Sequence, residues 1–244
     1  MQLEISFSKM IGLGTIVNTI AIIIGSLIGI FVGQKLPDRV RNILVRAAGL
    51  IVIGIGIKMF FESERIAVVF FGLVFGGIVG ELIGIESLLN TLGIKVKSLA
   101  KSESTTFLEG FVTTSLLYCV GPMAILGSIA DGLNNQYDIL FTKSILDGVT
   151  AIAFTASLGI GVLFSSLPVL IYQGVITVLA ILLGNLFTTS MISELTATGG
   201  LLLAGIGINL TGVFAENNKL PIGNLLPAIV FTPLLIWFLG LFGF

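Results

Sequence analysis

Residues 12–33 read GLGTIVNTIAIIIGSLIGIFVG, a run without a charged side chain. A hydrocarbon core of roughly 30 Å needs about 20 apolar residues in an α-helix, so this stretch is long enough to cross a bilayer. Further apolar runs follow at about 42–61, 66–85, 106–130, 143–164, 167–187, 198–214 and 222–243. The pattern predicts an all-α membrane protein with about eight transmembrane helices, forming a single polytopic membrane domain over residues 1–244.

The composition points the same way. Hydrophobic residues make up 55% of the chain and charged residues 10%, whereas roughly 25% of residues are charged in an average soluble domain. The net charge is −1 and no cluster of Lys and Arg is present, which argues against a nucleic-acid partner, because that binding rests on basic side chains meeting phosphates. Cys119 is the one cysteine and histidine is absent. We therefore expect no cofactor and no metal, and the lipid bilayer as the main partner.

Basic residues predict the orientation of the helices. Because cytoplasmic loops carry an excess of Lys and Arg, the richer set of breaks between helices is expected inside the cell. One side of the predicted helices carries eight basic residues and the other carries four. The first set is Lys35, Arg39, Arg41, Arg46, Lys95, Lys97, Lys101 and Lys219, and the second is Lys9, Lys58, Arg65 and Lys143. With eight crossings, both termini are predicted to lie outside.

Two internal similarities predict an inverted repeat. Residues 49–59 read GLIVIGIGIKM and residues 200–210 read GLLLAGIGINL, with six of eleven positions identical. In the same way, the Leu-Glu-Gly at 108–110 and the Leu-Asp-Gly at 146–148 are each followed by a glycine, at 121 and 159. The matched helices are an odd number of crossings apart, so they run in opposite directions. The predicted halves are approximately 12–130 and 143–243, and two halves of opposite orientation are typical of secondary transporters. A glycine-rich apolar composition alone is an alternative explanation of the similarities.

Glycines at intervals of four predict close helix packing. One series is Gly25, Gly29 and Gly33, and the other is Gly72, Gly76, Gly80 and Gly84. Small residues on one helical face let another backbone approach, which favours association of helices in lipid. Such a face is also compatible with sliding of one bundle against another, or with a homo-oligomer.

Two sequences predict broken helices at membrane depth, in the fourth and fifth spans. Gly121-Pro122 and Gly159-Ile-Gly161 both disfavour a continuous helix, because proline removes a hydrogen-bond donor and glycine lowers helix stability. In transporters, unwound backbone of this kind faces the solute. A simple kink, with hydroxyls bonded back to the helix, is the alternative. The residues predicted to bind a solute or ion near these breaks are Glu109, Thr113, Thr114, Ser115, Gly121, Pro122, Asp147, Thr155, Ser157 and Gly159.

Glu109 and Asp147 occupy matched positions in the second similarity, with Glu109 expected near the inner surface and Asp147 near the outer one. Each follows a hydroxyl residue by three positions, Thr106 or Ser144, so a capping box at a helix start is an alternative to ion handling. A carboxylate in a cavity of low dielectric could also bind a proton or Na⁺.

Three segments resemble the YqgA/YdfK-like family of bacterial integral membrane proteins. They are residues 107–132, FLEGFVTTSLLYCVGPMAILGSIADG, residues 143–148, KSILDG, and residues 14–19, GTIVNT. The resemblance covers essentially the whole chain. It implies a prokaryotic inner-membrane location and a functionally uncharacterised group for which transport has been suggested. It supplies no substrate and no binding residues.

We expect a secondary transporter or facilitator of a small solute or ion, with alternating access between inverted repeats and binding near the interrupted fourth and fifth helices. An ion channel and a non-transporting membrane scaffold or sensor are the alternatives. An enzyme is not expected, since Cys119 and the serines have no histidine to act as a base.

Overall fold

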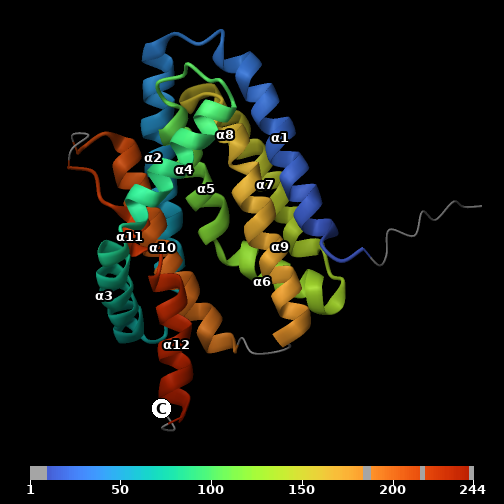
Figure 1. The fold of residues 1–244 in the computed structure, drawn as a ribbon, viewed down its shortest axis with the longest axis vertical. Helices are drawn as coiled ribbons and strands as arrows, with labels where there is room; N and C mark the ends of the chain where they lie inside the picture. The colour runs from blue at the N-terminus through green and yellow to red at the C-terminus, as the bar shows by residue number, and fades with distance from the viewer. Residues whose placement is uncertain (1–9, 184–187, 215–217, 242–244) are drawn as a thin grey trace, which may run out of the picture.

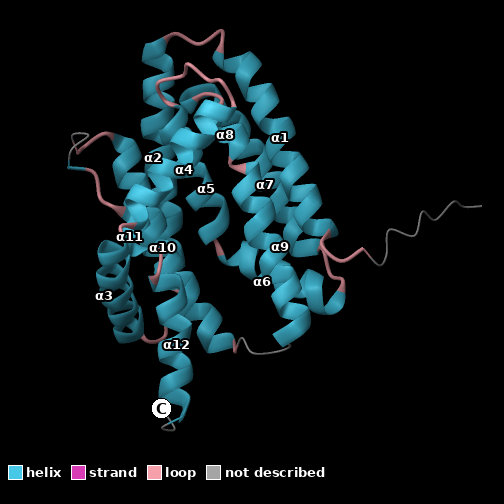
Figure 2. Ribbon diagram, in the orientation of Figure 1, coloured by secondary structure: helices cyan, strands magenta, loops and turns pink. Residues whose placement is uncertain are grey.

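The computed structural model describes residues 10–183, 188–214 and 218–241, and in these residues all regular structure is helical. Figure 1 shows the helices as one bundle, and Figure 2 shows that mostly short loops join them. In chain order the helices are α1 (Leu13–Gly33), α2 (Asp38–Phe60), α3 (Ile66–Ile83), α4 (Ile85–Leu99), α5 (Phe107–Val120), α6 (Pro122–Asn134), α7 (Asp138–Leu158), α8 (Gly161–Phe164), α9 (Ser166–Leu183), α10 (Thr189–Thr211), α11 (Ile222–Leu225) and α12 (Ala228–Leu241).

Within the described ranges, seven segments are long and apolar enough to cross a membrane, and an eighth crossing results if the bent pair α5–α6 forms one span. The seven are α1, α2, α3, α7, Gly161–Ile181, α10 and Ile222–Leu241. The expected all-α membrane fold is therefore confirmed. α10 begins at residue 189 and not near 198 as predicted. Met191 and residues 194–197 are buried against other helices, so this more polar stretch needs no apolar run.

Glycine contacts fix the directions of the main helix pairs. In α1, glycines 25, 29 and 33 face residues 148, 152 and 156 of α7 in turn, so these two helices run parallel. In α3, glycines 72, 76 and 80 face residues 232, 228 and 224, so α3 and the α11–α12 segment run antiparallel. The predicted close packing is confirmed for these six glycines. Gly84 differs, since it ends α3 in the left-handed region at φ 75° and faces open space.

The two segments that share the GxxxxGxG pattern pack directly against each other, one in α2 and one in α10. A Cβ on Gly49 would meet the carbonyl oxygen of Gly207 at 2.7 Å, and a Cβ on Gly207 would meet that of Gly49 at 2.6 Å. Gly56 and Gly200 face each other's carbonyl oxygens in the same reciprocal way. The helices therefore touch backbone to backbone and run antiparallel.

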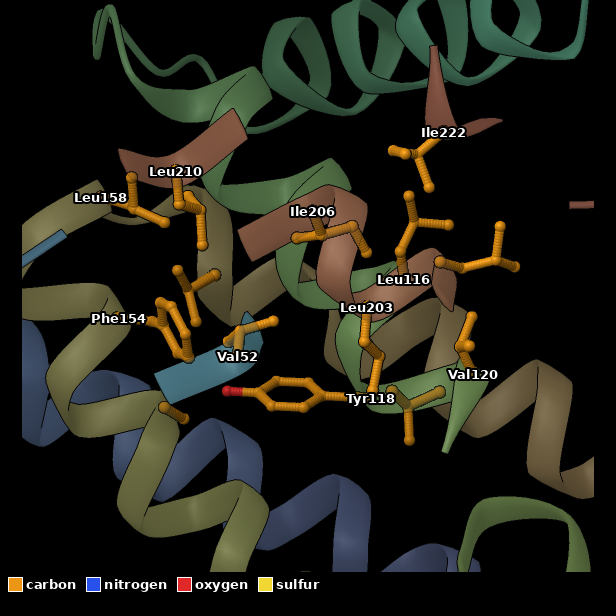
Figure 3. Close-up of a cluster of buried hydrophobic side chains, with 14 of the residues drawn as sticks. Val52, Leu116, Tyr118, Val120, Phe154, Leu158, Leu203, Ile206, Leu210 and Ile222 are labelled. Atoms are coloured by element: carbon orange, nitrogen blue, oxygen red, sulfur yellow. The ribbon is translucent and has the colours of Figure 1, made fainter. Parts of the chain in front are cut away.

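The interior of the bundle is an apolar cluster centred on α5. Figure 3 shows the ring of Tyr118 among side chains of α2, α7 and α10, including Val52, Phe154 and Leu203. Tyr118 is 1% exposed although it carries a hydroxyl group. The cluster holds α5 between α7 on one side and α10 on the other.

Of the two predicted helix breaks, the one at Gly121-Pro122 is present. α5 ends at Val120, α6 begins with Pro122, and the two helices meet at 57°. The second predicted break, at Gly159, was wrong, because this glycine lies at the end of a helix and not within a span. Gly159 has φ +83° and ends α7, after which α8 and α9 form the next span. α7 starts at residue 138, five residues before the predicted start, so a full-length helix is already complete at Leu158.

Candidate functional site

A buried ion pair lies on α7. The Nζ of Lys143 is 2.5 Å from an Oδ of Asp147, one helical turn later, and the two side chains are 5% and 9% exposed. The Nδ2 of Asn18 on α1 donates a hydrogen bond to the same carboxylate oxygen at 3.0 Å. A charge buried in this way needs a partner, because removing one member of a buried pair typically costs about 3–5 kcal/mol.

Tyr118 of α5 lies next to the lysine. The Lys143 ammonium lies 5.7 Å from the centre of the Tyr118 ring, within the range of a cation–π interaction. The Tyr118 hydroxyl lies 3.4 Å from the Oγ1 of Thr150 on α7. Side chains from α1, α5 and α7 thus meet at this ion pair. We refer to Asn18, Tyr118, Lys143 and Asp147 as the buried charge cluster.

The buried charge cluster lies near the middle of α7. Asp147 follows the first residue of that helix by nine positions, which corresponds to about 14 Å of helix. We expected Asp147 near the outer surface, at the start of a span, and the structure instead places it well inside the helix. The reason is the earlier start of α7 at Asp138.

The expected capping boxes are absent. The hydroxyl of Thr106 donates to the carbonyl of Leu158 at 2.7 Å, and that of Ser144 donates back to Leu140 within α7. Two other helix starts, those of α1 and α3, are capped by carboxylates of distant helices. Asp131 of α6 accepts hydrogen bonds from the backbone N–H groups of Gly12 and Gly14 at the start of α1.

A second acidic cap lies at the start of α3. Glu194 of α10 accepts hydrogen bonds from the backbone N–H groups of Glu64 and Arg65, each at 2.8 Å, and from the hydroxyl of Ser63. Both acidic caps are fully buried. A carboxylate is favourable at such a place because a helix N-terminus carries partial positive charge and free N–H groups. Asp131 and Glu194 therefore have a structural role.

A pocket of about 390 Å³ lies between α4, α5, α10 and the segment that leads into α11, and we call it the polar pocket because six of its 15 lining residues are polar. Two of the predicted residues, Glu109 and Thr113, line it. The carboxylate of Glu109 forms an ion pair with Lys219 at 3.2 Å, with the two side chains 37% and 26% exposed. The other lining residues are Glu86, Asn90, Leu108, Val112, Leu116, Ile206, Asn209, Leu210, Leu220, Pro221, Ile222 and Gly223.

The remaining predicted residues are spread over other places. Thr114, Ser115 and Ser157 donate their hydroxyls back to carbonyls of their own helices. Thr155 and Gly159 line a smaller pocket of about 160 Å³ beside α1 and α2. Gly121 and Pro122 form the bend between α5 and α6. The structure therefore divides the predicted set among the polar pocket, the buried charge cluster, the bend and the smaller pocket.

Several buried polar atoms near the interior of α1 and α9 have no hydrogen-bond partner among the described residues. On α1 these are the Oγ1 of Thr15 and the Oδ1 of Asn18, and on α9 they are both amide atoms of Gln173 and the Oγ1 of Thr177. All four side chains are at most 2% exposed. Buried polar groups are normally paired, so these atoms are available to a water, ion or solute.

Comparisons with known proteins agree with the family resemblance of the sequence. Residues 13–237 match the family described as "Protein of unknown function (DUF554)". The chain is 32% identical to "Uncharacterized membrane protein YdfK" of Bacillus subtilis (strain 168) over 234 residues, which cover 94% of this chain and 98% of the relative. It is 31% identical to "Uncharacterized protein YqgA" of Escherichia coli (strain K12) over 223 residues, 89% and 93% of the two chains. No solved structure matches. The resemblance is thus confirmed, and the chain belongs to this family.

Proposed function

Since the chain is a multi-pass membrane protein of the DUF554 family, we propose that it is a secondary transporter or facilitator of a small solute or ion. The observation that carries the proposal is the position of α5. One end of this helix lines the polar pocket through Glu109 and Thr113, and its other end places Tyr118 over the buried Lys143. A single helix thus links a pocket to charged groups in the interior.

Charged groups inside a membrane bundle favour this assignment over a purely structural one. Ionisable residues within spans are costly and commonly mark solute or ion pathways. The pair formed by Lys143 and Asp147 lies in the middle of a span, and Asn18 and Tyr118 approach it from two other helices. A scaffold would not need two opposite charges at this depth.

The bend that follows α5 supports movement of this helix. A Cβ added at Gly121 would meet nothing within 4 Å, so open space adjoins the break. The backbone there is extended, with φ −71° and ψ 148°, and broken helices of this kind are typical of transporters. Gly121-Pro122 is the hinge in the proposed alternating access.

The inverted repeat is part of the proposal. Its support is the reciprocal contact of α2 and α10, in which Gly49 faces Gly207 and Gly56 faces Gly200. In the sequence match, Gly49 corresponds to Gly200 and Gly56 to Gly207, so exchanging the matched residues turns one of these contacts into the other. A twofold axis between the halves 12–130 and 143–243 would give this relation.

A prokaryotic inner-membrane location with both termini outside also belongs to the proposal. Its support is the excess of Lys and Arg at one set of loops. The burial of Lys143 strengthens the asymmetry, because this residue leaves the poorer set. We further propose that the protein has no enzymatic activity.

Uptake by proteoliposomes tests the transport role. A panel of small organic anions, amino acids, sugars and alkali cations is offered to vesicles that contain the wild type, Asp147→Asn or Glu103→Gln. Glu103 is an exposed loop carboxylate, so its variant is the matched control. We expect uptake of at least one solute above that of empty vesicles, and a loss of roughly tenfold or more in Asp147→Asn, equivalent to about 1.4 kcal/mol. The control should retain uptake.

Absence of uptake by the wild type across the panel would refute the proposal. Unitary current steps in a planar bilayer would instead identify a channel, since a carrier moves solute too slowly to produce them.

A further inference from the structure

We propose that Asp147 is the anchor of a binding site for a monovalent cation, and that the ammonium group of Lys143 occupies this site in the present conformation. The inference rests on the proposed transport role, which it deepens by naming the class of coupling ion. In this view Lys143 is a tethered cation that leaves when a free cation enters.

The immediate surroundings of the Lys143 ammonium are those of a cation site. It contacts the carboxylate of Asp147 and lies over the face of Tyr118, 5.7 Å from the ring centre. Carboxylate oxygens and aromatic faces are the groups that attract cations in proteins. The ammonium therefore marks a place where the protein stabilises one positive charge.

Oxygen atoms on α1 extend the site beyond what the lysine uses. Asn18 binds Asp147 through its Nδ2, which leaves its Oδ1 buried and without a partner. One helical turn earlier, the Oγ1 of Thr15 is also buried and unpaired. Both side chains are at most 2% exposed. A small cation that binds Asp147 would find an amide oxygen already held beside the carboxylate.

α9 contributes unpaired polar atoms at a matching height. α1 packs against α9 and the two run in opposite directions. On α6, Asp131 binds the N–H of Gly14 at the start of α1, and the next residue, Gly132, packs against the carbonyl of Thr177 on α9. Because α1 and α9 run in opposite directions, Asn18 and Gln173 each lie about one turn from this level in the same direction. Neither amide atom of Gln173 has a partner although its side chain is fully buried.

The donor set favours a monovalent cation. Ca²⁺ and Mg²⁺ are generally held with the help of two or more carboxylates or of phosphates. Among the described residues no group of three His, Cys, Asp or Glu side chains could hold a metal ion. The pair of Lys143 and Asp147 is neutral as it stands. A single positive charge that replaces the ammonium on Asp147 keeps the carboxylate neutralised, whereas a second cation beside the ammonium would leave a net charge buried.

Na⁺ and a proton share this chemistry, and the other titratable groups near Asp147 are few. They are Lys143 on its own helix and Tyr118 and Cys119 on α5, while Tyr172 of α9 adjoins Cys119. α1 has no titratable side chain in Leu13–Gly33. Binding measurements at different Na⁺ concentrations and pH values therefore distinguish the two cations.

The first experiment removes the tethered cation. Purified Lys143→Ala in detergent is melted in NaCl or choline chloride at constant ionic strength, and at several pH values. At a 100-fold excess of Na⁺ over its Kd we expect a rise in Tm of roughly 5–10 °C over choline. The double variant Lys143→Ala with Asp147→Asn should show no such rise. A rise on acidification alone, lost in the double variant, would identify the proton as the cation and also support the site.

The second experiment uses the wild type and does not depend on folding of the lysine variant. Binding of ²²Na⁺ is measured at alkaline and neutral pH, with Asp147→Asn as the comparison. We expect saturable binding that unlabelled Na⁺ displaces and choline does not, and that Asp147→Asn weakens by roughly tenfold or more.

The proposal is overturned if the wild type shows neither saturable Na⁺ binding nor proton uptake that depends on Asp147. It is equally overturned if folded Lys143→Ala responds to neither Na⁺ nor pH. Neither experiment measures solute movement, so a failed transport assay and a failed cation site give separate results.

Discussion

Replacing the two members of the buried ion pair singly and together should give strongly non-additive changes in stability. The side chains of Lys143 and Asp147 are 5% and 9% exposed, so either charge alone would have little access to water. Removing one partner of such a pair typically costs about 3–5 kcal/mol, whereas replacing both by apolar groups of similar size is often neutral or stabilising.

The variants are Lys143→Met, Asp147→Leu and the double variant. If each single change costs about 4 kcal/mol and the double change costs about 0–1 kcal/mol, the interaction energy is about 7–8 kcal/mol in favour of the double variant. Asp147→Leu also loses the hydrogen bond from Asn18, so we expect it to be the more damaging single change.

The free energy of unfolding is measured in mixed micelles by titration with a denaturing detergent, with helix content followed by circular dichroism. Glu103→Leu, at an exposed loop position, controls for the effect of adding a leucine, and its free energy of unfolding should change by less than about 0.5 kcal/mol. The reasoning is refuted if the single variants each cost under about 1 kcal/mol and their effects add in the double variant, because the two charges would then be hydrated or independent.

Three other changes have expected outcomes that the same unfolding assay measures. Gly56→Ala should destabilise by about 1–3 kcal/mol because its Cβ would overlap the backbone of α10. The control Gly54→Ala in the same helix meets nothing within 4 Å and should be neutral or stabilise by up to about 1 kcal/mol. Equal effects of the two changes would contradict the close contact of α2 and α10. Glu109→Gln should cost at most about 1 kcal/mol, because its ion pair with Lys219 is partly exposed and screened by solvent, and a larger cost would show that the pair is buried in solution. Asp131→Ala should cost about 1–3 kcal/mol through the two N–H groups that it leaves unpaired at the start of α1, and Asp131→Asn, which keeps an acceptor oxygen, should cost less.

Most of the fold could be predicted because lipid imposes a length and a polarity on each span. The predicted run at 66–85 matches α3 closely, since both faces of that helix are apolar. The start of α10 was missed for the opposite reason. Glu194 is charged, yet it is buried and caps α3, and Thr196 and Thr198 are buried as well. Hydropathy does not distinguish a polar residue in water from one buried against protein.

The bend at Gly121-Pro122 and the helix end at Gly159 show why two similar patterns had different outcomes. Proline has no N–H and clashes with the preceding turn, so the Gly-Pro sequence is a local signal that favours an interruption in mid-span. Gly159 has φ +83° and ψ −167°, a backbone conformation that glycine adopts readily and that ends the helix. The position of this end in the span depends on where α7 begins. The sequence carries no equally local signal for that start.

The candidate site was predicted only in part. Asp147 was identified, but Lys143 was interpreted as a residue at the membrane surface because the apolar run begins there. Its spacing of four from Asp147 is a signal that could have found the pair, since residues four apart share a helical face. Asn18 and Tyr118 come from α1 and α5, and no local pattern indicates that they meet α7 at this carboxylate.

Several side-chain hydrogen bonds between the described helices fall into two groups, and we refer to the helices joined by each group as one body. Asp131 and Asp147 join α6 and α7 to α1, while Glu194 joins α10 to α3. A hydrogen bond of Asn224 to Glu81 adds the α11 segment to the second body. α5 has contacts on both sides, through Thr106 just before it and through Glu109. A relative rotation of the two bodies would therefore leave the capped helix ends intact and change the contacts of α5 and of α2, which also packs against both α7 and α10. We expect the amide protons of α5 to exchange with solvent ahead of those of α1 and α10.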